Sequence, residues 1–226
     1  MKTFSMPRFM GTLFFASMLT LSAEAAQINT IIDTGSGMFG EPEKVYEEID
    51  ASIQSWFYPN KEERSKLTFS QRKALGDPSQ LVFIPIAESD GLVQIYREER
   101  GAAASTDATI TAGQVRDTTL TREDMVNLCH ELGADYILYF RVNNSIPKAS
   151  VGFMSAGQKT NVTTDFRIWN AKQGKYVFVK RYLTTGASNT IYARGMGSSS
   201  HAVRNGLNKA LKEIDKDKDK FVPLVK

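Results

Sequence analysis

The pattern of apolar and polar positions divides the chain into short segments with strand or helix periodicity. Residues 27–32 are rich in apolar and β-branched side chains and run into a turn sequence at Asp33, which predicts a buried strand. A helix is predicted next, because Pro42 suits a first helical position and apolar residues then recur at four- and three-residue steps. This apolar stripe consists of Val45, Ile49, Ile53 and Trp56.

A second apolar run, residues 81–86, has the length of a strand. Pro85 lacks a backbone donor, so the run is expected at a sheet edge or a strand end. The segment 87–100 fits two structures. An Asp-Gly pair at residue 90 is a hairpin signal, whereas Ser89 as an N-cap would begin a helix, and the sequence alone leaves both open.

The next helix is predicted from its ends. The Thr121 hydroxyl can cap the first turn while Asp124 reaches back, which is a capping-box arrangement, and Gly133 suits a left-handed stop. The residues expected on its buried side are Met125, Leu128, Cys129 and Leu132. Residues 135–142 follow at once as an almost wholly apolar strand, which indicates a central position in the sheet.

The last third of the chain predicts a hairpin and a closing helix. Residues 162–169 alternate between apolar and polar side chains, residues 170–174 supply a turn, and residues 175–183 return as the second strand. Serines at 198–200 can cap a helix. Its inward face is expected to consist of Val203, Leu207, Ala210, Leu211 and Ile214.

These elements predict an α+β fold in which helices pack on a mixed sheet of about five strands. The expected order is strand, helix, strand, helix, strand, hairpin, helix. One domain is expected over residues 26–214. Residues 215–226 are expected to be a charged C-terminal tail, because lysines and aspartates alternate over 215–220 and predict a solvated run.

The first 25 residues have the order of a cleavable signal peptide. Lys2 and Arg8 precede an apolar stretch, and small residues at Ala23 and Ala25 suit a cleavage site. The apolar stretch is shorter than the roughly 20 residues that a membrane-spanning helix needs. We therefore expect an exported, soluble protein that is periplasmic or extracellular. A bacterial lipoprotein needs a cysteine at the cleavage point, and the single cysteine is Cys129, so the sequence predicts no lipid anchor and no transmembrane segment.

Composition excludes several partners and chemistries. The formal net charge is only +3, and no dense run of Lys or Arg predicts a nucleic-acid surface. Cys129 lies among apolar helix positions and is interpreted as a buried core residue, because His130 beside it points elsewhere on a helix. With His130 and His201 as the only histidines, no tetrahedral zinc site is predicted without carboxylate help. No cofactor and no metal are expected.

One motif resembles a catalytic turn. Asp33, Thr34 and Gly35 follow two isoleucines, as in the catalytic turn of aspartic proteases. That chemistry needs two aspartates that share a proton, and no second Asp-Thr-Gly or Asp-Ser-Gly occurs in the chain. The favoured interpretation is structural, with the Asp33 carboxylate accepting a backbone N–H in the turn after the first strand.

The run Glu131-Leu132-Gly133-Ala134-Asp135-Tyr136-Ile137-Leu138, followed later by Phe166-Arg167-Ile168-Trp169-Asn170-Ala171 before Gly174, resembles a known pattern. It is similar to the core of the TolB amino-terminal-like superfamily of envelope proteins. That superfamily includes the curli secretion channel subunit (CsgG) and the lipoprotein activators of penicillin-binding proteins. The resemblance is clearest over residues 121–185 and implies a non-catalytic envelope domain that binds other proteins.

The sequence therefore predicts an exported, non-catalytic module that binds a protein partner in the cell envelope or helps to assemble one. Two alternatives stay open: a hydrolase with a non-local active site, and a structural subunit that forms homo-oligomers through the strand at 175–183. The segment 143–160 is the first candidate for partner contact, because apolar residues lie in a glycine- and serine-containing loop. The candidate contact residues are Ile146, Val151, Phe153 and Met154.

Overall fold

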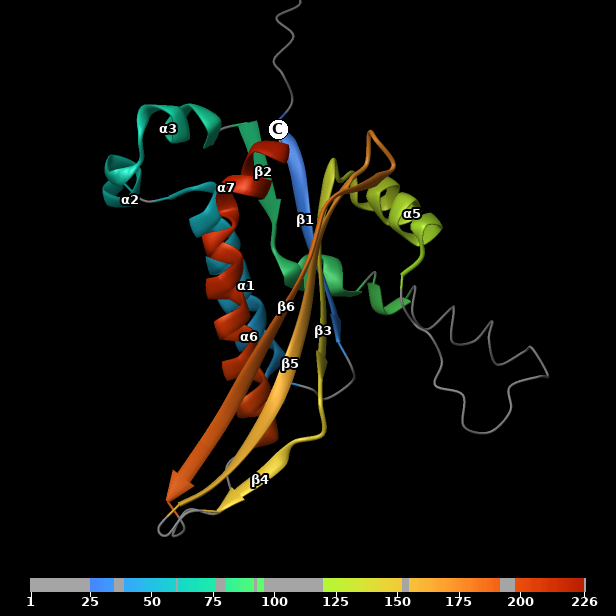
Figure 1. Ribbon diagram of the computed structural model, residues 1–226. Helices are drawn as coiled ribbons and strands as arrows, with labels where there is room; N and C mark the ends of the chain where they lie inside the picture. The colour runs from blue at the N-terminus through green and yellow to red at the C-terminus, as the bar shows by residue number, and fades with distance from the viewer. Residues whose placement is uncertain are drawn as a thin grey trace, which may run out of the picture.

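The computed structural model describes residues 25–34, 39–59, 61–75, 80–91, 93–95, 120–151, 155–191 and 198–225. These residues form one six-stranded mixed sheet with helices on both faces (Figure 1). The strand order is β2-β1-β3-β5-β4, and β6 pairs with the other edge of β5. The predicted α+β class is confirmed, with one strand more than the approximate number expected.

Three strands form the parallel half of the sheet. They are β1 (Ala26–Thr34), β2 (Leu81–Ile84) and β3 (Tyr136–Asn144), with β1 between the other two. β3 is central, as predicted, because it pairs with β1 on one side and with β5 on the other. β2 ends two residues earlier than expected and lies at the sheet edge, which suits the Pro85 that follows it.

The antiparallel half is longer than the sequence predicted. β5 (Ser155–Asn170) and β6 (Lys175–Ile191) form the expected hairpin, but each strand continues well beyond the alternating segment. β4 (Lys148–Val151) pairs with the first part of β5, next to the end of β3. Figure 1 shows β4, β5 and β6 projecting together beyond the parallel strands, and we call this projection the arm.

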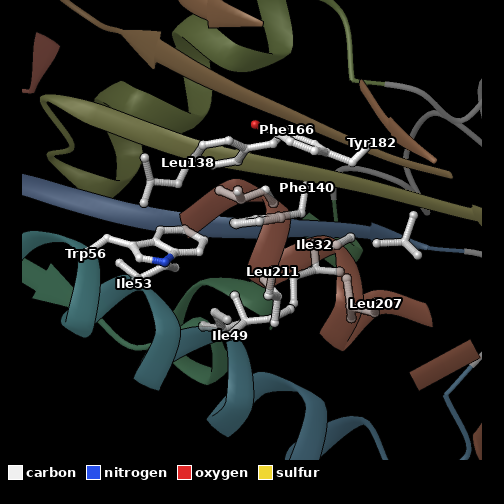
Figure 2. Packing of buried hydrophobic residues seen from close by; sticks show 14 of the residues in the cluster. Ile32, Ile49, Ile53, Trp56, Leu138, Phe140, Phe166, Tyr182, Leu207 and Leu211 are labelled. Carbon is white, nitrogen blue, oxygen red and sulfur yellow. The ribbon is translucent and has the colours of Figure 1, made fainter. Parts of the chain in front are cut away.

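One face of the sheet is covered by α1 (Pro42–Phe57) and α6 (Ser199–Lys216). The predicted stripes of both helices are buried against the sheet, as Figure 2 shows for Ile49, Ile53, Trp56, Leu207 and Leu211. Phe140 and Phe166 stack at 4.8 Å between ring centroids, and Trp56 meets both rings. Burial of such rings is the largest single source of apolar stabilisation in this core.

The expectation of a solvated run over 215–220 is wrong at Asp217, which is buried, whereas Lys216, Asp219 and Lys220 are exposed as expected. Phe221, Val222 and Val225 after this run belong to the core. α7 (Lys218–Phe221) and η3 (Val222–Leu224) place Phe221 at 0% exposure among the rings of Trp56, Phe166 and Phe178. Asp217 is only 7% exposed. The alternating charges are not equivalent, because Asp217 turns toward β6 and bonds there to Lys180 and Tyr182.

The other face is covered at one end by α5 (Arg122–Leu132). The predicted capping box is present, since Thr121 Oγ1 accepts from the Asp124 amide and the Asp124 carboxylate accepts from the Thr121 amide. Gly133 ends the helix with φ of 62° in the left-handed region, as predicted. Met125, Leu128 and Cys129 are buried beneath it.

Residues 86–91 and 93–95 are helical, which decides between the two structures left open for this segment. Ser89 is not the N-cap. Its hydroxyl lies inside the helix and donates to the Thr30 carbonyl at 2.7 Å, while the Ile86 amide donates to the Asp50 carboxylate of α1 at 3.3 Å. The first turn is therefore capped by a distant element. The preceding connector forms two short helices, α2 (Lys61–Lys66) and α3 (Phe69–Leu75).

Close backbone contact joins α6 to β6. A Cβ on Gly186 would lie 1.7 Å from the Ala202 carbonyl oxygen, and one on Gly206 would lie 2.4 Å from a Val162 methyl. The Thr184 hydroxyl donates to the Gly206 carbonyl at 2.7 Å. Thr184 and Gly186 of β6 thus face α6. Successive side chains of a strand point to opposite sides, so the odd-numbered residues in this part of β6 face away from α6.

Candidate functional site

The candidate contact residues are only partly within the described structure. Ile146 lies between β3 and β4 and is 87% exposed, which is the highest value among the exposed large apolar residues described. Val151 is the last residue of β4. Phe153 and Met154 lie outside the described residues. The structure therefore places one predicted contact residue at the surface, and the role of the set stays a prediction.

A second exposed apolar group lies on β6, on the side opposite α6. Val179 is 62% exposed and Leu183 is 76% exposed, and both belong to β6, the edge strand that pairs with β5. Neither belongs to the two buried clusters of the described residues. We call this surface, beyond the part of the sheet that α5 covers, the distal face. It consists of Asp33, Arg141, Asn143, Thr163, Asp165, Val179, Arg181 and Leu183.

A row of alternating charges crosses the distal face. The strand register places Asp33 of β1 opposite Arg141 of β3, Arg141 opposite Asp165 of β5, and Asp165 opposite Arg181 of β6. Directly opposed residues of neighbouring strands point to the same side, so opposite charges stabilise this register. The row therefore fixes how four strands align and gives the face a fixed charge pattern.

Asp165 is the best-connected member of the row. Arg181 Nε donates to Oδ1 at 2.6 Å and Arg181 Nη2 donates to Oδ2 at 3.0 Å, which is a bidentate pair. Arg167 Nη2 lies 3.7 Å from the same carboxylate. These bonds, chiefly those from Arg181, lower the pKa of Asp165. The carboxylate is thus held ionised and engaged.

Arg167 is held by aromatic rings as well. Its guanidinium carbon lies 6.0 Å from the centroid of Tyr139 and 5.6 Å from that of Tyr176, at the outer range of cation–π attraction. The Tyr139 hydroxyl donates to the Asp33 carboxylate at 2.5 Å. Burial, followed by the charge of Asp33, raises the pKa of Tyr139. This tyrosine keeps its proton and works as a donor.

The structure gives Asp33 a partner within the sheet. The residue is 7% exposed and its carboxylate accepts from the Tyr139 hydroxyl. The backbone N–H bond expected in the following turn stays a prediction. The turn itself, residues 35–38, lies outside the described residues. Asp165 is the other aspartate of the charge row, and Arg141 lies between it and Asp33 in the strand register. The two carboxylates therefore do not share a proton as the pair of an aspartic protease does.

The remaining chemically reactive groups give no catalytic arrangement among the residues that are described. Cys129 is buried as predicted, and burial raises the pKa of its thiol to about 12. Such a thiol is a poor nucleophile at neutral pH. Within the described ranges, no group of three or more His, Cys, Asp or Glu residues is placed to hold a metal ion.

Sequence reasoning missed the distal face. Alternation over 162–169 puts Asp165 and Arg167 on the polar side of their strand. Asp33 and Arg141 belong to other strands and come into line with Asp165 only through the register of the sheet. Alternation shows which side of a strand a residue takes, not which residues of other strands lie opposite. The one available signal was the occurrence of Val179 and Leu183 on the strand side that also carries an arginine.

Comparisons with known proteins relate the chain to solved structures alone. No protein-family model and no curated protein matches it. The hypothetical protein CT253 from Chlamydia trachomatis is similar at 10% identity, over 87% of this chain and 97% of that chain, with a TM-score of 0.39. Lipoprotein GNA1162 from Neisseria meningitidis is similar at 13% identity, over 84% and 99%, with a TM-score of 0.35.

The C-terminal domain of LpoB from Salmonella enterica is a further similar structure, at 11% identity over 71% of this chain and 82% of that chain, with a TM-score of 0.24. The resemblance to the lipoprotein activators of penicillin-binding proteins stays a prediction. The TolB and curli-channel (CsgG) parts are not supported.

The expectation that the protein has no lipid anchor is contradicted. Several of the similar structures carry the name lipoprotein, among them GNA1162 and a minor lipoprotein from Acinetobacter baumannii. Our expectation rested on one residue type at one expected cleavage point. Residues 1–24 of the expected leader lie outside the described residues.

The described part of the chain contains no helix with the length and apolar character needed to cross a membrane.

Proposed function

We propose that this chain is a non-catalytic module of the cell envelope that binds a protein partner through the distal face and the adjoining base of the arm. The observation that carries the proposal is the exposure of Val179 and Leu183, at 62% and 76%, on a rigid strand that pairs with β5 along its whole length. Exposed large apolar side chains on a sheet surface, rimmed by polar residues, are typical of protein-interaction surfaces.

The surroundings of these two residues support the proposal. Arg181 lies between them on the same side of β6 and is itself anchored to Asp165. Arginine beside apolar groups is enriched at protein interfaces, and a pre-positioned side chain loses less entropy on binding. Ile146 adds an exposed apolar group at the start of the arm.

The titratable groups of this region favour binding over catalysis. Asp165 is ionised and paired, Tyr139 keeps its proton, and Arg167 lies between two aromatic rings. A general acid or base needs a pKa near the working pH and a reachable proton, and these side chains have neither. A hydrolase with a non-local site would have to use other residues.

The edge of β6 gives little support to self-assembly through its C-terminal half. The backbone amide and carbonyl of Asn161 both bond to Ser145, so they point away from β6. Thr185, which lies opposite Asn161 on β6, is therefore a non-hydrogen-bonded partner, and its own carbonyl points to the outer edge of the sheet. Lys209 donates to that carbonyl at 2.7 Å, and Asn205 donates to the Ala187 carbonyl at 2.8 Å. Side chains of α6 thus occupy acceptors that a second strand would need.

The test is a crosslinking pull-down from the producing cell. The double variant Val179→Ser/Leu183→Ser should lose the captured partner and keep a wild-type circular dichroism spectrum, because both side chains contact solvent. Phe69→Ser is the matched control, since Phe69 is 77% exposed on α3, away from this face, and it should leave capture unchanged. Equal capture by both variants, or turnover of a small molecule without any stable protein partner, would overturn the proposal.

A further inference from the structure

A small basic hollow lies where β3 passes into β4. It has a volume of about 220 Å³ and is lined by Ser145, Lys148, Lys159, Thr160 and Asn161. The strand register places Lys148 of β4 directly opposite Lys159 of β5. Lys159 is on the same side of β5 as Asp165, because residues two apart along a strand face the same way, so the hollow continues the distal face toward the arm.

The hollow arises from an irregularity in strand pairing. Asn144 pairs with Val162 and Lys148 pairs with Lys159, so residues 145–147 lie opposite 160–161 and one residue is extra. Extra residues of this kind commonly re-aim side chains next to functional sites. The Thr160 hydroxyl donates to the Ser145 carbonyl at 2.7 Å, and the Asn161 amide donates to Ser145 Oγ at 3.0 Å. The irregularity is therefore held in one geometry.

The two lysines are an unfavourable pair as they stand. Cβ atoms of directly opposed residues lie about 4.5–5.5 Å apart, and like charges at this separation destabilise a sheet. Among the residues that the structure describes, no carboxylate forms an ion pair with either ammonium group. By contrast, Arg181 and Lys180 on the neighbouring strand each have an aspartate partner. An anion between Lys148 and Lys159 would turn the repulsion into attraction.

The size of the hollow and its neighbour indicate what kind of anion fits. Pockets that enclose whole small-molecule ligands have volumes of about 300–1,000 Å³, so 220 Å³ suits a single acidic group better than a complete ligand. Ile146, which lies between β3 and β4 next in sequence to Ser145 of the hollow, is 87% exposed and is free to make an apolar contact. A polypeptide with an acidic residue next to an apolar residue would supply an anion for the two lysines and an apolar contact for Ile146.

We propose that the hollow between Lys148 and Lys159 binds a carboxylate of an acidic segment in the partner protein. This inference rests on the proposed function and adds the chemistry of the partner. It makes the base of the arm the charge-selective part of the interface, with the apolar residues of β6 supplying contact area.

The experiment measures the thermal midpoint of the full chain with a glutamate-rich, leucine-containing peptide, at constant ionic strength. The wild type should gain about 3 °C or more at saturating peptide. Lys159→Glu should raise the midpoint without peptide, because it pairs with Lys148, and should abolish the response to peptide. Lys172→Glu, in the turn at the other end of β5 and β6, changes the charge equally and should keep the response.

Equal responses of the two variants, or no response of the wild type, would overturn the inference. Inorganic phosphate at the same ionic strength is the second probe, and stabilisation by phosphate as large as that by the peptide would overturn the assignment to an acidic polypeptide. The assay uses the chain and a peptide alone. Absence of any peptide response in the wild type, with cellular capture intact, would therefore reject the hollow and leave the proposed function standing.

Discussion

The two faces of the sheet carry different chemistry. The face under α1 and α6 contains a continuous apolar core in which the rings of Trp56, Phe140, Phe166 and Phe221 contact one another. The distal face carries a row of charges with exposed apolar side chains beside it. The same strands supply both, because successive side chains point to opposite sides. Substitutions at alternate residues of one strand should therefore change either the stability of the fold or the binding of a partner, and not both.

The largest effect is expected on the covered face. Phe166→Ala removes a fully buried ring that meets four other aromatic rings, and should lower the free energy of unfolding by about 3–5 kcal/mol. Urea unfolding followed by tryptophan fluorescence measures it. A loss below about 1 kcal/mol would show that this cluster is not the core that the structure describes.

An intermediate effect is expected at the junction of β6 with the C-terminal helices. Hydrogen bonds from Lys180 and Lys220 hold the pKa of Asp217 well below its usual range. The folded-state pKa is thus lower than the unfolded value of about 3.9. The stabilisation is present above about pH 4 and is lost as the pH falls toward the folded-state pKa.

Asp217→Asn should therefore lower the free energy of unfolding at pH 7 by about 2 kcal/mol, the magnitude typical of hydrogen bonds to a charged group. Below about pH 4, wild type and variant should converge. Unfolding curves at a series of pH values check this. A constant difference between the two proteins across that range would mean that the Asp217 charge is not what matters.

The smallest effect is expected on the distal face. Leu183→Ser should change the free energy of unfolding by no more than about 0.5 kcal/mol, because the leucine is 76% exposed and belongs to no buried cluster of the described residues. The same urea titration measures it beside Phe166→Ala. If Leu183→Ser cost more than about 1.5 kcal/mol, Leu183 would be a core residue and the contrast between the faces would fail.

How far the sequence predicts this molecule depends on the range of the interactions. Local signals sufficed for the capping box at Thr121, the stop at Gly133 and the stripe from Val45 to Trp56, since each depends on residues within a few turns. The helix that begins at Ile86 was left open because its cap is Asp50, which only the folded chain brings near.

The same limit explains what sequence reasoning missed at the C-terminus and on the distal face. Alternating charges at 215–220 predict solvation, yet the buried Asp217 has partners on β6 that a local pattern cannot reveal. The charge row from Asp33 to Arg181 depends on the register of four strands. Ile146 was within reach of sequence reasoning, because it is an apolar residue in a polar loop.

The central claim is that the distal face is the surface that meets a protein partner. The most direct measurement places a photoreactive phenylalanine analogue at Leu183 in one protein and at Phe69 in another, followed by irradiation of producing cells and mass analysis of the adducts. Both positions are exposed, at 76% and 77%, so reactivity toward solvent is matched. The account predicts a discrete adduct with one envelope protein from position 183 and none from position 69. The same adduct from both positions, or an adduct from position 69 alone, would contradict it.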